Sequence, residues 1–424
     1  MLDLKNELSS INNNDTTFID ETKRDANEIK VGKSAWTTKT GFSNETVYKK
    51  MNASSGKIMY HTHFCFKDWK QFDEDTKALQ KNLNDNNLTL DRFGVSIDSS
   101  MALPPKEMRS STETHTALFF ESEEDWKHLS SVNFSQVHLG DNMIGSPASY
   151  DSCINALKAG ITTMGNISQF FGWDYEQFQN VEERTKNTIK AIVVMSAHKK
   201  AGALIHSNLD DGYGQATSKI SELLGMAILE KYIVCDLLGA KLAPSFGDDF
   251  HSPYKRLIML SALSQLYNGD LVGSMLFENK LGRNKHNIKL NDSHLSECLL
   301  FDMAGQVHYK TGHAVTVMAN EGLTENVKPE EVVEKLALAK ELESYVPEIL
   351  KVIDFEKIDK IAYQELQKGK HFSEAVLSAF SSYIDISNPY AVMLAIKKVG
   401  VKNLIDSFAY DNDAIETDFA HFEH

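Results

Sequence analysis

The fold is decided by the stretch Ala203-Leu204-Ile205-His206-Ser207-Asn208-Leu209-Asp210-Asp211-Gly212-Tyr213-Gly214-Gln215. Leu204 and Ile205 predict a short buried strand, and the polar and glycine residues after them predict an exposed turn. Apolar residues then recur at helical spacing, which predicts a helix that starts near Ala216. The stretch is therefore one strand-loop-helix unit. Its polar residues follow the C-terminal end of the strand, where parallel α/β folds carry their chemistry.

Strand-like segments of the same kind recur along the chain, and each ends in a polar cluster. They are predicted at residues 58–66, 93–98, 116–120, 134–139, 160–164, 241–246, 272–277 and 306–309. Amphipathic segments such as 69–83 and 149–157 predict helices between them. About eight or nine such units over roughly 260 residues have the size and rhythm of a (β/α)8 barrel. The predicted fold class is therefore α/β, a TIM barrel.

Three parts of the chain differ in pattern. Residues 1–56 are rich in polar side chains with weak periodicity, so we expect a loosely packed N-terminal extension. Residues 57–324 would form the (β/α)8 barrel, and residues 325–424 a helical C-terminal region. An open doubly wound sheet is the competing geometry. The barrel is favoured because no glycine-rich dinucleotide fingerprint follows any strand.

Composition excludes several classes of partner. A net charge of −15 argues against nucleic acid or anionic lipid as a bulk partner, because both need a basic surface. No apolar run reaches membrane-spanning length, and no signal peptide is evident. Four widely spaced cysteines predict reduced core thiols, so we expect a cytoplasmic protein.

Five short segments carry a resemblance to a known family through their order. They are Ser96-Ile97-Asp98, Ile144-Gly145-Ser146-Pro147, Gly165-Asn166-Ile167-Ser168, Ser245-Phe246-Gly247-Asp248 and Lys310-Thr311-Gly312-His313-Ala314. Over roughly residues 57–324, they resemble the strand ends of the large, barrel-forming component of glutamate mutase (methylaspartate mutase). That family consists of adenosylcobalamin-dependent carbon-skeleton isomerases, which use a radical mechanism.

The resemblance implies roles for particular residues. Catalysis is assigned to Lys310, Asp248 and Glu278, which would border the adenosyl group and the substrate. The substrate side would be formed by His61, His63, Asp98, Asn166, Gln169, His206 and Asn208. Cofactor binding is assigned to Asp210, Tyr213, Gln215, Lys310 and His313. The cobalamin-binding domain is not found in this sequence, so the resemblance implies a separate small cobalamin-binding subunit.

Several positions depart from the family pattern. The family binds a dicarboxylate substrate with three arginines, and the matching positions here are His63, Ala102, and Met143 or Ile144. A family tyrosine is Gln169, and the glutamate that contacts the cofactor ribose is Ala314. We therefore expect a substrate other than glutamate. An acidic barrel mouth favours a neutral or cationic ligand; it is formed by Asp98, Asp141, Asp210, Asp211, Asp248 and Glu278.

Two other functions remain open. His61 and His63 fall on one face of a strand, a pattern typical of metal-dependent TIM-barrel hydrolases and lyases. Further ligands would be needed, and His138, His206 and Asp302 are available. The loss of the family arginines also allows a non-catalytic homologue that acts as a binding subunit.

The C-terminal helices suggest self-association. They carry more apolar residues than a solvated helix needs: Val392, Met393, Ile396, Val399 and Leu404. Together with the pairing of barrels in the family that the chain resembles, this pattern predicts a homodimer.

Overall fold

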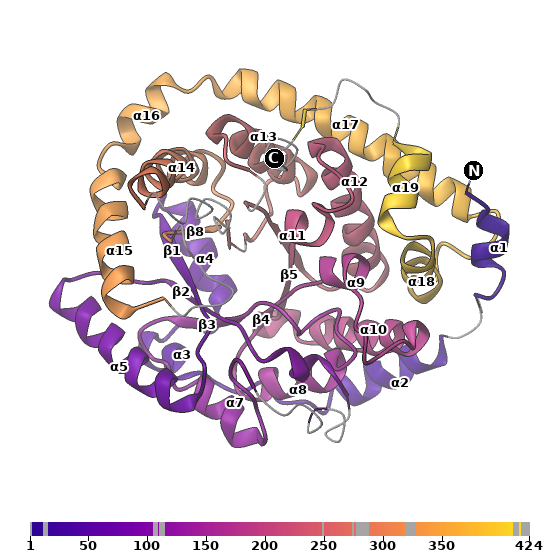
Figure 1. Cartoon of the computed structure of the whole chain (residues 1–424), viewed down its shortest axis with the longest axis horizontal. Coiled ribbons are helices and arrows are strands. Elements are labelled where there is room, and N and C mark those ends of the chain that lie inside the picture. Colours follow the sequence, from indigo (N-terminus) through magenta and orange to yellow (C-terminus); the bar gives the residue numbers. More distant parts are fainter. Residues whose placement is uncertain are drawn as a thin grey trace.

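The computed structural model describes residues 2–11, 16–104, 109, 115–247, 250–273, 275–276, 288–318, 327–409 and 415–416. At its centre is one curled parallel sheet surrounded by helices (Figure 1). Its strands are β1 (Met59–Phe64), β2 (Arg92–Val95), β3 (Gln136–Leu139), β4 (Thr163–Met164), β5 (Leu204–Asn208), β6 (Leu242–Ser245), β7 (Met275–Leu276) and β8 (Ala314–Thr316).

The strand order is β6-β5-β4-β3-β2-β1-β8-β7, and every neighbouring pair is parallel. This confirms an α/β fold with successive strands side by side. Within the described residues no pairing joins β6 to β7, so the sheet is not a closed ring there. The first and last strands do meet, because β1 pairs with both β2 and β8.

Helices cover the outer face of the sheet in chain order. They include α5 (Trp69–Asp85), α7 (Glu123–Leu129), α8 (Ser149–Lys158), α10 (Val181–Ala197), α12 (Ile220–Lys231), α13 (Pro253–Leu266) and α14 (Ile288–Tyr309). Aromatic residues on the outward side of the strands fill the layer beneath them; the rings of Phe64 and Phe93 stack with centroids 4.5 Å apart. Inward residues are left to line the interior of the sheet. We call the N-terminal ends of the strands the base and the C-terminal ends the mouth.

Local signals explain where helices start. Asp68 accepts a hydrogen bond from the backbone N–H of Gln71 at the start of α5, as expected for an N-cap aspartate. Asp125 accepts the backbone N–H of Ser122 at the start of α7, where the sequence predicted a helix. After β5, however, the short helix α11 (Leu209–Tyr213) intervenes, and α12 begins at Ile220 rather than near Ala216.

The predicted last strand is wrong. Residues 306–309 form the final turn of α14, and β8 begins at Ala314. Val307-His308-Tyr309 is a short apolar run that fits either a strand or a helix, and packing decides: the His308 ring stacks on Phe355 with centroids 3.7 Å apart. The segment 116–120 is also not a strand, since only Leu118 forms a bridge, with Ile97.

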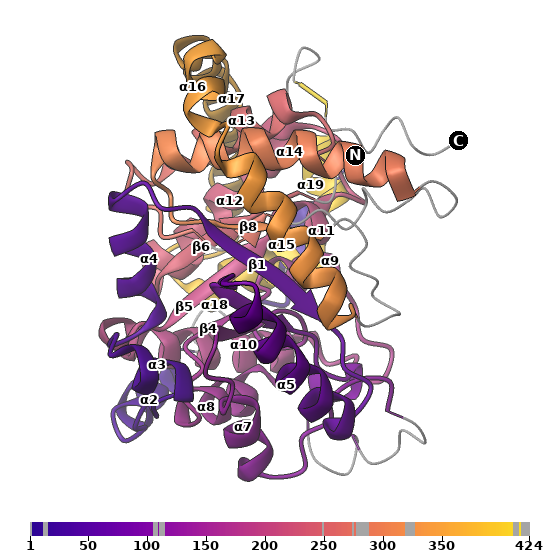
Figure 2. The same cartoon turned by 90° about the vertical axis from the view of Figure 1, so that its left-hand side faces the viewer.

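The described residues among the first 56 form packed helices, unlike the loose extension that we expected. They contain α1 (Leu4–Leu8), α2 (Thr17–Ala26), α3 (Ala35–Thr40) and α4 (Glu45–Ser54). Phe18, Ile19 and Ala26 of α2 are buried, and α2 packs against α10. Figure 2 shows α3 and α4 at the left, on the side where β1 begins. These helices therefore lie across the base of the sheet.

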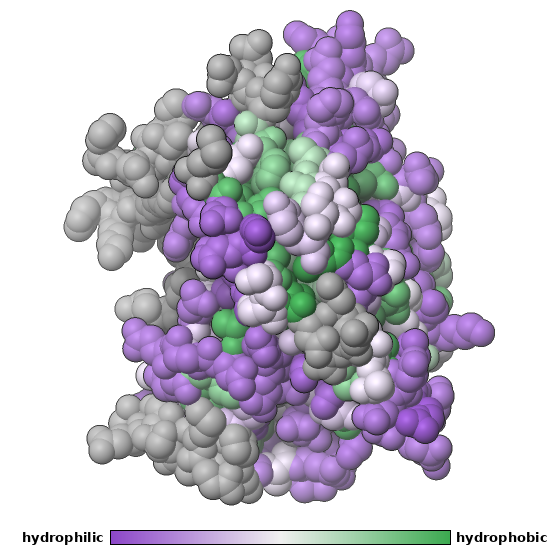
Figure 3. Space-filling view, turned by 90° about the vertical axis from the view of Figure 1, so that its right-hand side faces the viewer, coloured by the Kyte–Doolittle hydropathy of each residue, from purple (hydrophilic) through white to green (hydrophobic). Residues whose placement is uncertain are grey.

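The C-terminal region is helical, as predicted. It comprises α15 (Pro329–Glu343), α16 (Val346–Val352), α17 (Phe355–Phe380), α18 (Pro389–Val399) and α19 (Val401–Phe408). The apolar residues that suggested a dimer are buried within the chain, because α18 packs against α10 and α1. Figure 3 faces this side and shows a central band of apolar and pale residues bordered by hydrophilic ones. A homodimer stays a prediction, but the five apolar residues of α18 and α19 no longer support it, because they are buried within one chain.

Candidate functional site

Four histidines project into the interior of the sheet. His61 and His63 come from β1, His138 from β3 and His206 from β5, and the exposed fraction of His61, His138 and His206 is 1% or less. The His138 and His206 ring centroids lie 4.2 Å apart, and the His61 and His63 centroids 6.1 Å apart. Burial lowers the pKa of His63 to about 4 and holds the pKa values of the other three well below their usual range. All four imidazoles are therefore neutral near pH 7.

Glycines on adjacent strands make room for these rings. A Cβ on Gly94 would lie 2.5 Å from Nδ1 of His63 and 2.6 Å from Cε1 of His61. A Cβ on Gly165 would lie 2.1 Å from Nε2 of His206. The imidazole rings thus lie directly against the backbone of Gly94 and Gly165. Any side chain at either glycine would displace the rings.

A buried ion cluster supports the histidines from the base. Glu45 of α4 receives Lys49 Nζ at 3.2 Å and Arg92 Nε at 3.3 Å, and Thr163 donates to its second oxygen at 2.6 Å. One carboxylate faces two cations, so burial together with Arg92 lowers the pKa of Lys49 to about 7. Sequence reasoning missed this cluster. The start of α4 had a signal in Asn44, whose side chain accepts the N–H of Val47, but nothing in the sequence placed Glu45 beside Arg92.

The cluster fixes the tautomer of one interior histidine. Arg92 Nη2 lies 2.7 Å from Nδ1 of His138, and a guanidinium can only donate. Nδ1 of His138 also lies 3.3 Å from the Thr163 carbonyl, which could only accept from it, but the contact to Arg92 is much shorter. Nδ1 is therefore assigned as the acceptor, which places the proton of the neutral ring on Nε2. That Nε2 has no hydrogen-bond partner among the described residues.

Other polar atoms that face the interior also lack a hydrogen-bond partner. Within the described part of the chain, buried atoms without a hydrogen-bond partner include Gln169 Oε1, Asn208 Oδ1, His206 Nδ1 and Thr316 Oγ1. Thr316 pairs in register with His61, so it faces the same interior. Buried polar atoms are normally satisfied by protein or by bound molecules. Those on β3, β5 and β8 face the interior of the sheet, where they can accept or donate a further hydrogen bond.

Carboxylates and amides meet at the mouth. Gln169 Nε2 donates to Asp141 Oδ1 at 2.6 Å and to Asp211 Oδ2 at 3.3 Å, and Asn166 Nδ2 donates to Asp211 Oδ2 at 3.1 Å. We call Asp141, Asn166, Gln169 and Asp211 the mouth cluster. Both aspartates are half-buried, and burial raises the pKa of Asp141. A carboxylate that receives hydrogen bonds from amides can also accept one from a cationic group, which is a stronger, charge-assisted partner.

Loops around the mouth are fixed by their own polar contacts. Asp98 accepts N–H groups from Ser100, Thr116 and Ala117, so its oxygens hold the loop after β2 rather than a substrate. Hydrogen bonding to these N–H groups and to the Ser100 hydroxyl holds its pKa low against the effect of burial. His63 Nε2 lies 2.8 Å from Ser96 Oγ, on the next strand end. His63 is therefore oriented at the mouth, as expected, and Asp98 supports the rim.

Arg184 supports the same rim from outside. It donates to the carbonyls of Gly145, Trp173 and Gln169 at 2.7 to 2.9 Å. Its guanidinium donates to backbone carbonyls and does not neutralise the mouth cluster.

Several predicted site residues lie elsewhere. Because β8 starts at Ala314, Lys310 and His313 precede it and belong to the base, not the mouth. His313 is buried, with Nδ1 2.7 Å from Thr311 Oγ1 and Nε2 3.0 Å from the Pro244 carbonyl, and burial lowers its pKa to about 3.

The resemblance assigns Asp210, Tyr213 and Gln215 to cofactor binding, and the structure shows the surroundings of each within the chain. Tyr213 donates to Glu230 of α12 at 2.5 Å, Asp210 Oδ2 accepts the N–H of Gly247, and Gln215 is exposed. Burial raises the pKa of Tyr213 and raises that of Glu230 to about 7. These contacts join α11 to its neighbours. Asp248 and Glu278 lie outside the described residues.

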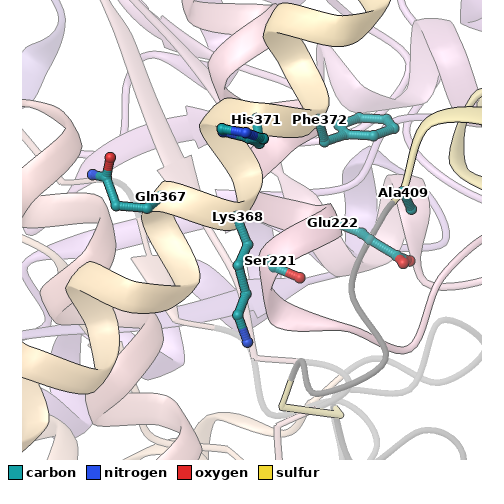
Figure 4. Close-up of a pocket in the computed structure, with 7 residues that line it drawn as sticks. All are labelled: Ser221, Glu222, Gln367, Lys368, His371, Phe372 and Ala409. Atoms are coloured by element: carbon teal, nitrogen blue, oxygen red, sulfur yellow. The ribbon is translucent and has the colours of Figure 1, made fainter.

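A separate hollow lies between α12 and α17 (Figure 4). It has a volume of about 240 Å³, and none of the predicted site residues lines it. Lys368 forms an ion pair with Glu365 at 3.0 Å, and Thr217 donates to Glu222. Its charged groups are balanced, so it does not belong to the candidate site.

Comparisons with known protein families and with curated proteins find no match for this chain. Within the described ranges, no three His, Cys, Asp or Glu side chains are grouped as metal ligands. In the same part of the chain, no helix has both the length and the apolarity to cross a membrane.

Proposed function

We propose that this chain is the catalytic barrel of a carbon-skeleton isomerase that acts on an amine-bearing substrate other than glutamate. The single observation that carries the substrate class is the mouth cluster, where Gln169 bridges the carboxylates of Asp141 and Asp211. An ammonium group placed there would add a charge-assisted partner to both carboxylates. The reaction class is supported by the resemblance of the strand ends to the mutase family.

The interior offers further contacts to such a substrate. Gln169 Oε1 and Asn208 Oδ1 are acceptors for N–H or O–H groups, and Nε2 of His138 is a donor. His63 and His206 are neutral near pH 7, so they can hold or exchange a hydrogen bond without adding positive charge. Among the described residues, the guanidinium of Arg184 beside this site is bonded to backbone carbonyls, so the environment favours an ammonium group over a carboxylate.

We also propose that the sheet closes as a (β/α)8 barrel between β6 and β7. Supporting contacts cross the gap: the His313 ring, just before β8, lies 3.0 Å from the Pro244 carbonyl of β6. Val272, just before β7, clusters with Ala243 of β6 and Leu204 of β5. Closure would place the four histidines inside a complete ring of strands.

Adenosylcobalamin, and a small subunit to bring it, enter this proposal through the resemblance alone. Lys310 and His313 lie at the base, Tyr213 faces Glu230, and Ala314 replaces the ribose-binding glutamate. The described residues therefore do not fit an adenosyl group in the arrangement that the resemblance implies. What this chain supplies at the mouth is substrate binding, orientation and exclusion of water.

Calorimetry on the intact chain tests the substrate class with ethanolamine, lysine and glutamate as probes. We expect ethanolamine or lysine, which carry net positive charge, to bind, glutamate, whose two carboxylates make it net negative, not to bind, and Asp211→Asn to weaken binding at least tenfold. Asp270→Asn, at an exposed carboxylate near the base, is the matched control and should change nothing. Tight glutamate binding, or an Asp211→Asn variant that binds like the wild type, would overturn the proposal. If the chain binds the amine but forms no rearranged product with a cobalamin-loaded partner, the isomerase part of the proposal fails and only the binding function is retained.

A further inference from the structure

The base of the molecule carries positive charge in a chain whose net charge is −15. One hollow of about 360 Å³ opens there between α4, the turn before β5 and the start of β6. We call it the lysine hollow. Among the described residues its lining contains four lysines and no carboxylate: Asn44, Thr46, Val47, Lys50, Lys199, Lys200, Gly202 and Lys241.

The backbone around the lysine hollow is fixed. Gly202 packs so closely on α4 that a Cβ there would lie 2.5 Å from the side chain of Asn44. Thr46 Oγ1 donates to the Gly202 carbonyl at 3.3 Å, and the Lys241 carbonyl accepts the N–H of Ile205. The lysines therefore extend from rigid attachment points, and only their flexible side chains need to adjust to a ligand.

Two of the four lysines are available to a ligand. Lys50 forms an ion pair with Asp270 at 2.9 Å, and Lys199 donates to the Gly239 carbonyl at 2.9 Å. The side chains of Lys200 and Lys241 have no hydrogen bond or ion pair within the described residues. Positive charge in the hollow is thus only partly compensated by the protein.

A neighbouring hollow shows the contrast. It is also lined by four lysines, at the start of β3 and β4: Lys33, Lys39, Lys127 and Lys158. There, Lys127 pairs with Glu124 at 2.7 Å and Lys158 with Glu123 at 3.1 Å. Lys39 donates to the side-chain oxygen of Asn133. Two of its four lysines thus pair with carboxylates, against one, Lys50, in the lysine hollow, so lysine content alone does not distinguish the two hollows.

We propose that the lysine hollow is a binding site for a small ligand with at least two phosphate groups. A single exposed lysine-phosphate pair is weak and screened by salt, so useful affinity needs several lysines acting on one multiply charged ligand. The side-chain amide of Asn44 and the hydroxyl of Thr46 add polar lining, and half-exposed Val47 offers an apolar ledge at the rim. A volume of about 360 Å³ is within the range of small-ligand pockets. This site lies at the opposite end of the strands from the mouth cluster and does not depend on the proposed function.

Calorimetry on the intact chain with inorganic pyrophosphate and with ATP, each without divalent metal, tests the site. We expect both to bind, and to bind several-fold more weakly at 200 mM than at 50 mM salt. The double variant Lys200→Ala, Lys241→Ala should weaken binding at least tenfold. The matched control Lys39→Ala, Lys127→Ala, in the neighbouring hollow, should stay within twofold of the wild type.

Circular dichroism before each titration establishes that both variants are folded, which is expected because all four side chains lie at the surface. Absence of pyrophosphate and ATP binding at millimolar concentration would overturn the proposal. An equal loss in the two double variants would do the same, since binding would then be a general surface effect. Binding of double-stranded DNA but not of pyrophosphate would point to a macromolecular partner and would also overturn it.

Discussion

The imidazole of His206 occupies the space that a side chain at Gly165 would need, with an added Cβ only 2.1 Å from its Nε2. Gly165→Ala should therefore displace His206 from the interior. We expect a loss of about 1 to 3 kcal/mol in the free energy of unfolding, as for other overpacked sites, and at least tenfold weaker amine binding. Urea unfolding and calorimetry measure the two effects.

Gly140→Ala provides a graded comparison. Its added Cβ would lie 3.0 Å from the edge of the His63 ring, so both effects should be smaller than for Gly165→Ala. Equal effects at the two positions would show that the fit around His206 is not special.

Glu45→Gln should be strongly destabilising. The carboxylate of Glu45 is the shared partner of Lys49 and Arg92, and all three side chains are buried. Removing one partner of a buried ion pair costs about 3 to 5 kcal/mol. Glu124→Gln breaks an exposed pair with Lys127 and should cost less than about 1 kcal/mol. Similar losses for the two variants in urea unfolding would contradict a structural role for the ion cluster.

The interior histidines predict acid sensitivity. His63 and His313 have folded-state pKa values of about 4 and about 3, below the usual 6.5. Between these values and 6.5 the unfolded chain binds more protons than the folded chain, so stability rises with pH up to about 6.5 and is lost as pH falls. Each such histidine contributes about 1.4 kcal/mol per pH unit within that window.

Urea unfolding between pH 5 and 6.5 measures this slope. His63→Gln should reduce it by close to one proton, whereas His371→Gln, at an exposed helix position, should leave it unchanged. An unaltered slope in His63→Gln would mean that His63 titrates normally in the folded protein.

Lys310→Ala should leave amine binding at the mouth unchanged. Lys310 lies before β8 at the base, where it lines a hollow with Lys50 and Gly312, and its side chain is exposed. The free energy of unfolding should change by less than about 0.5 kcal/mol, as at most surface positions. Calorimetry with the amine probe checks this, and a loss of binding would place the lysine nearer the mouth than its strand assignment allows.

Ile396→Ala should behave as a core substitution. Ile396 in α18 is fully buried within the chain, so its truncation should cost about 2 to 5 kcal/mol. Because the contact is within one chain, the loss should not depend on protein concentration. A concentration-dependent unfolding midpoint, together with a dimer mass by light scattering, would show that this side of the molecule also serves an interface.

Most of the fold could be predicted from the sequence because apolar runs with polar ends have a clear period. Met59–Phe64, Leu204–Asn208 and their helices were predicted on this basis. The last strand was not, because Val307 to Tyr309 is too short for periodicity to separate a strand from a helix end. That error carried Lys310 and His313 to the wrong end of the molecule.

The candidate site was predictable only where it follows strand ends. His63, Asn166, Gln169 and His206 were expected at the mouth or interior and are found there. Glu45 and Arg92 were not, because they meet only when α4 packs across the base. A contact between residues so far apart in sequence cannot be predicted from a local sequence pattern. The role of the three glycines beside the histidine rings could not be predicted either, because it depends on the register of the sheet.

The position of α4 makes the interior of this protein dependent on residues that precede the whole sheet in the sequence. During synthesis Glu45 leaves the ribosome before Arg92, with which it forms an ion pair, and before Thr163, whose hydroxyl donates to it. The anchor is therefore already present when the strands that surround it arrive. A chain started by re-initiation at Met59 would still encode the whole sheet, yet its arginine would face the interior histidines without a counter-charge.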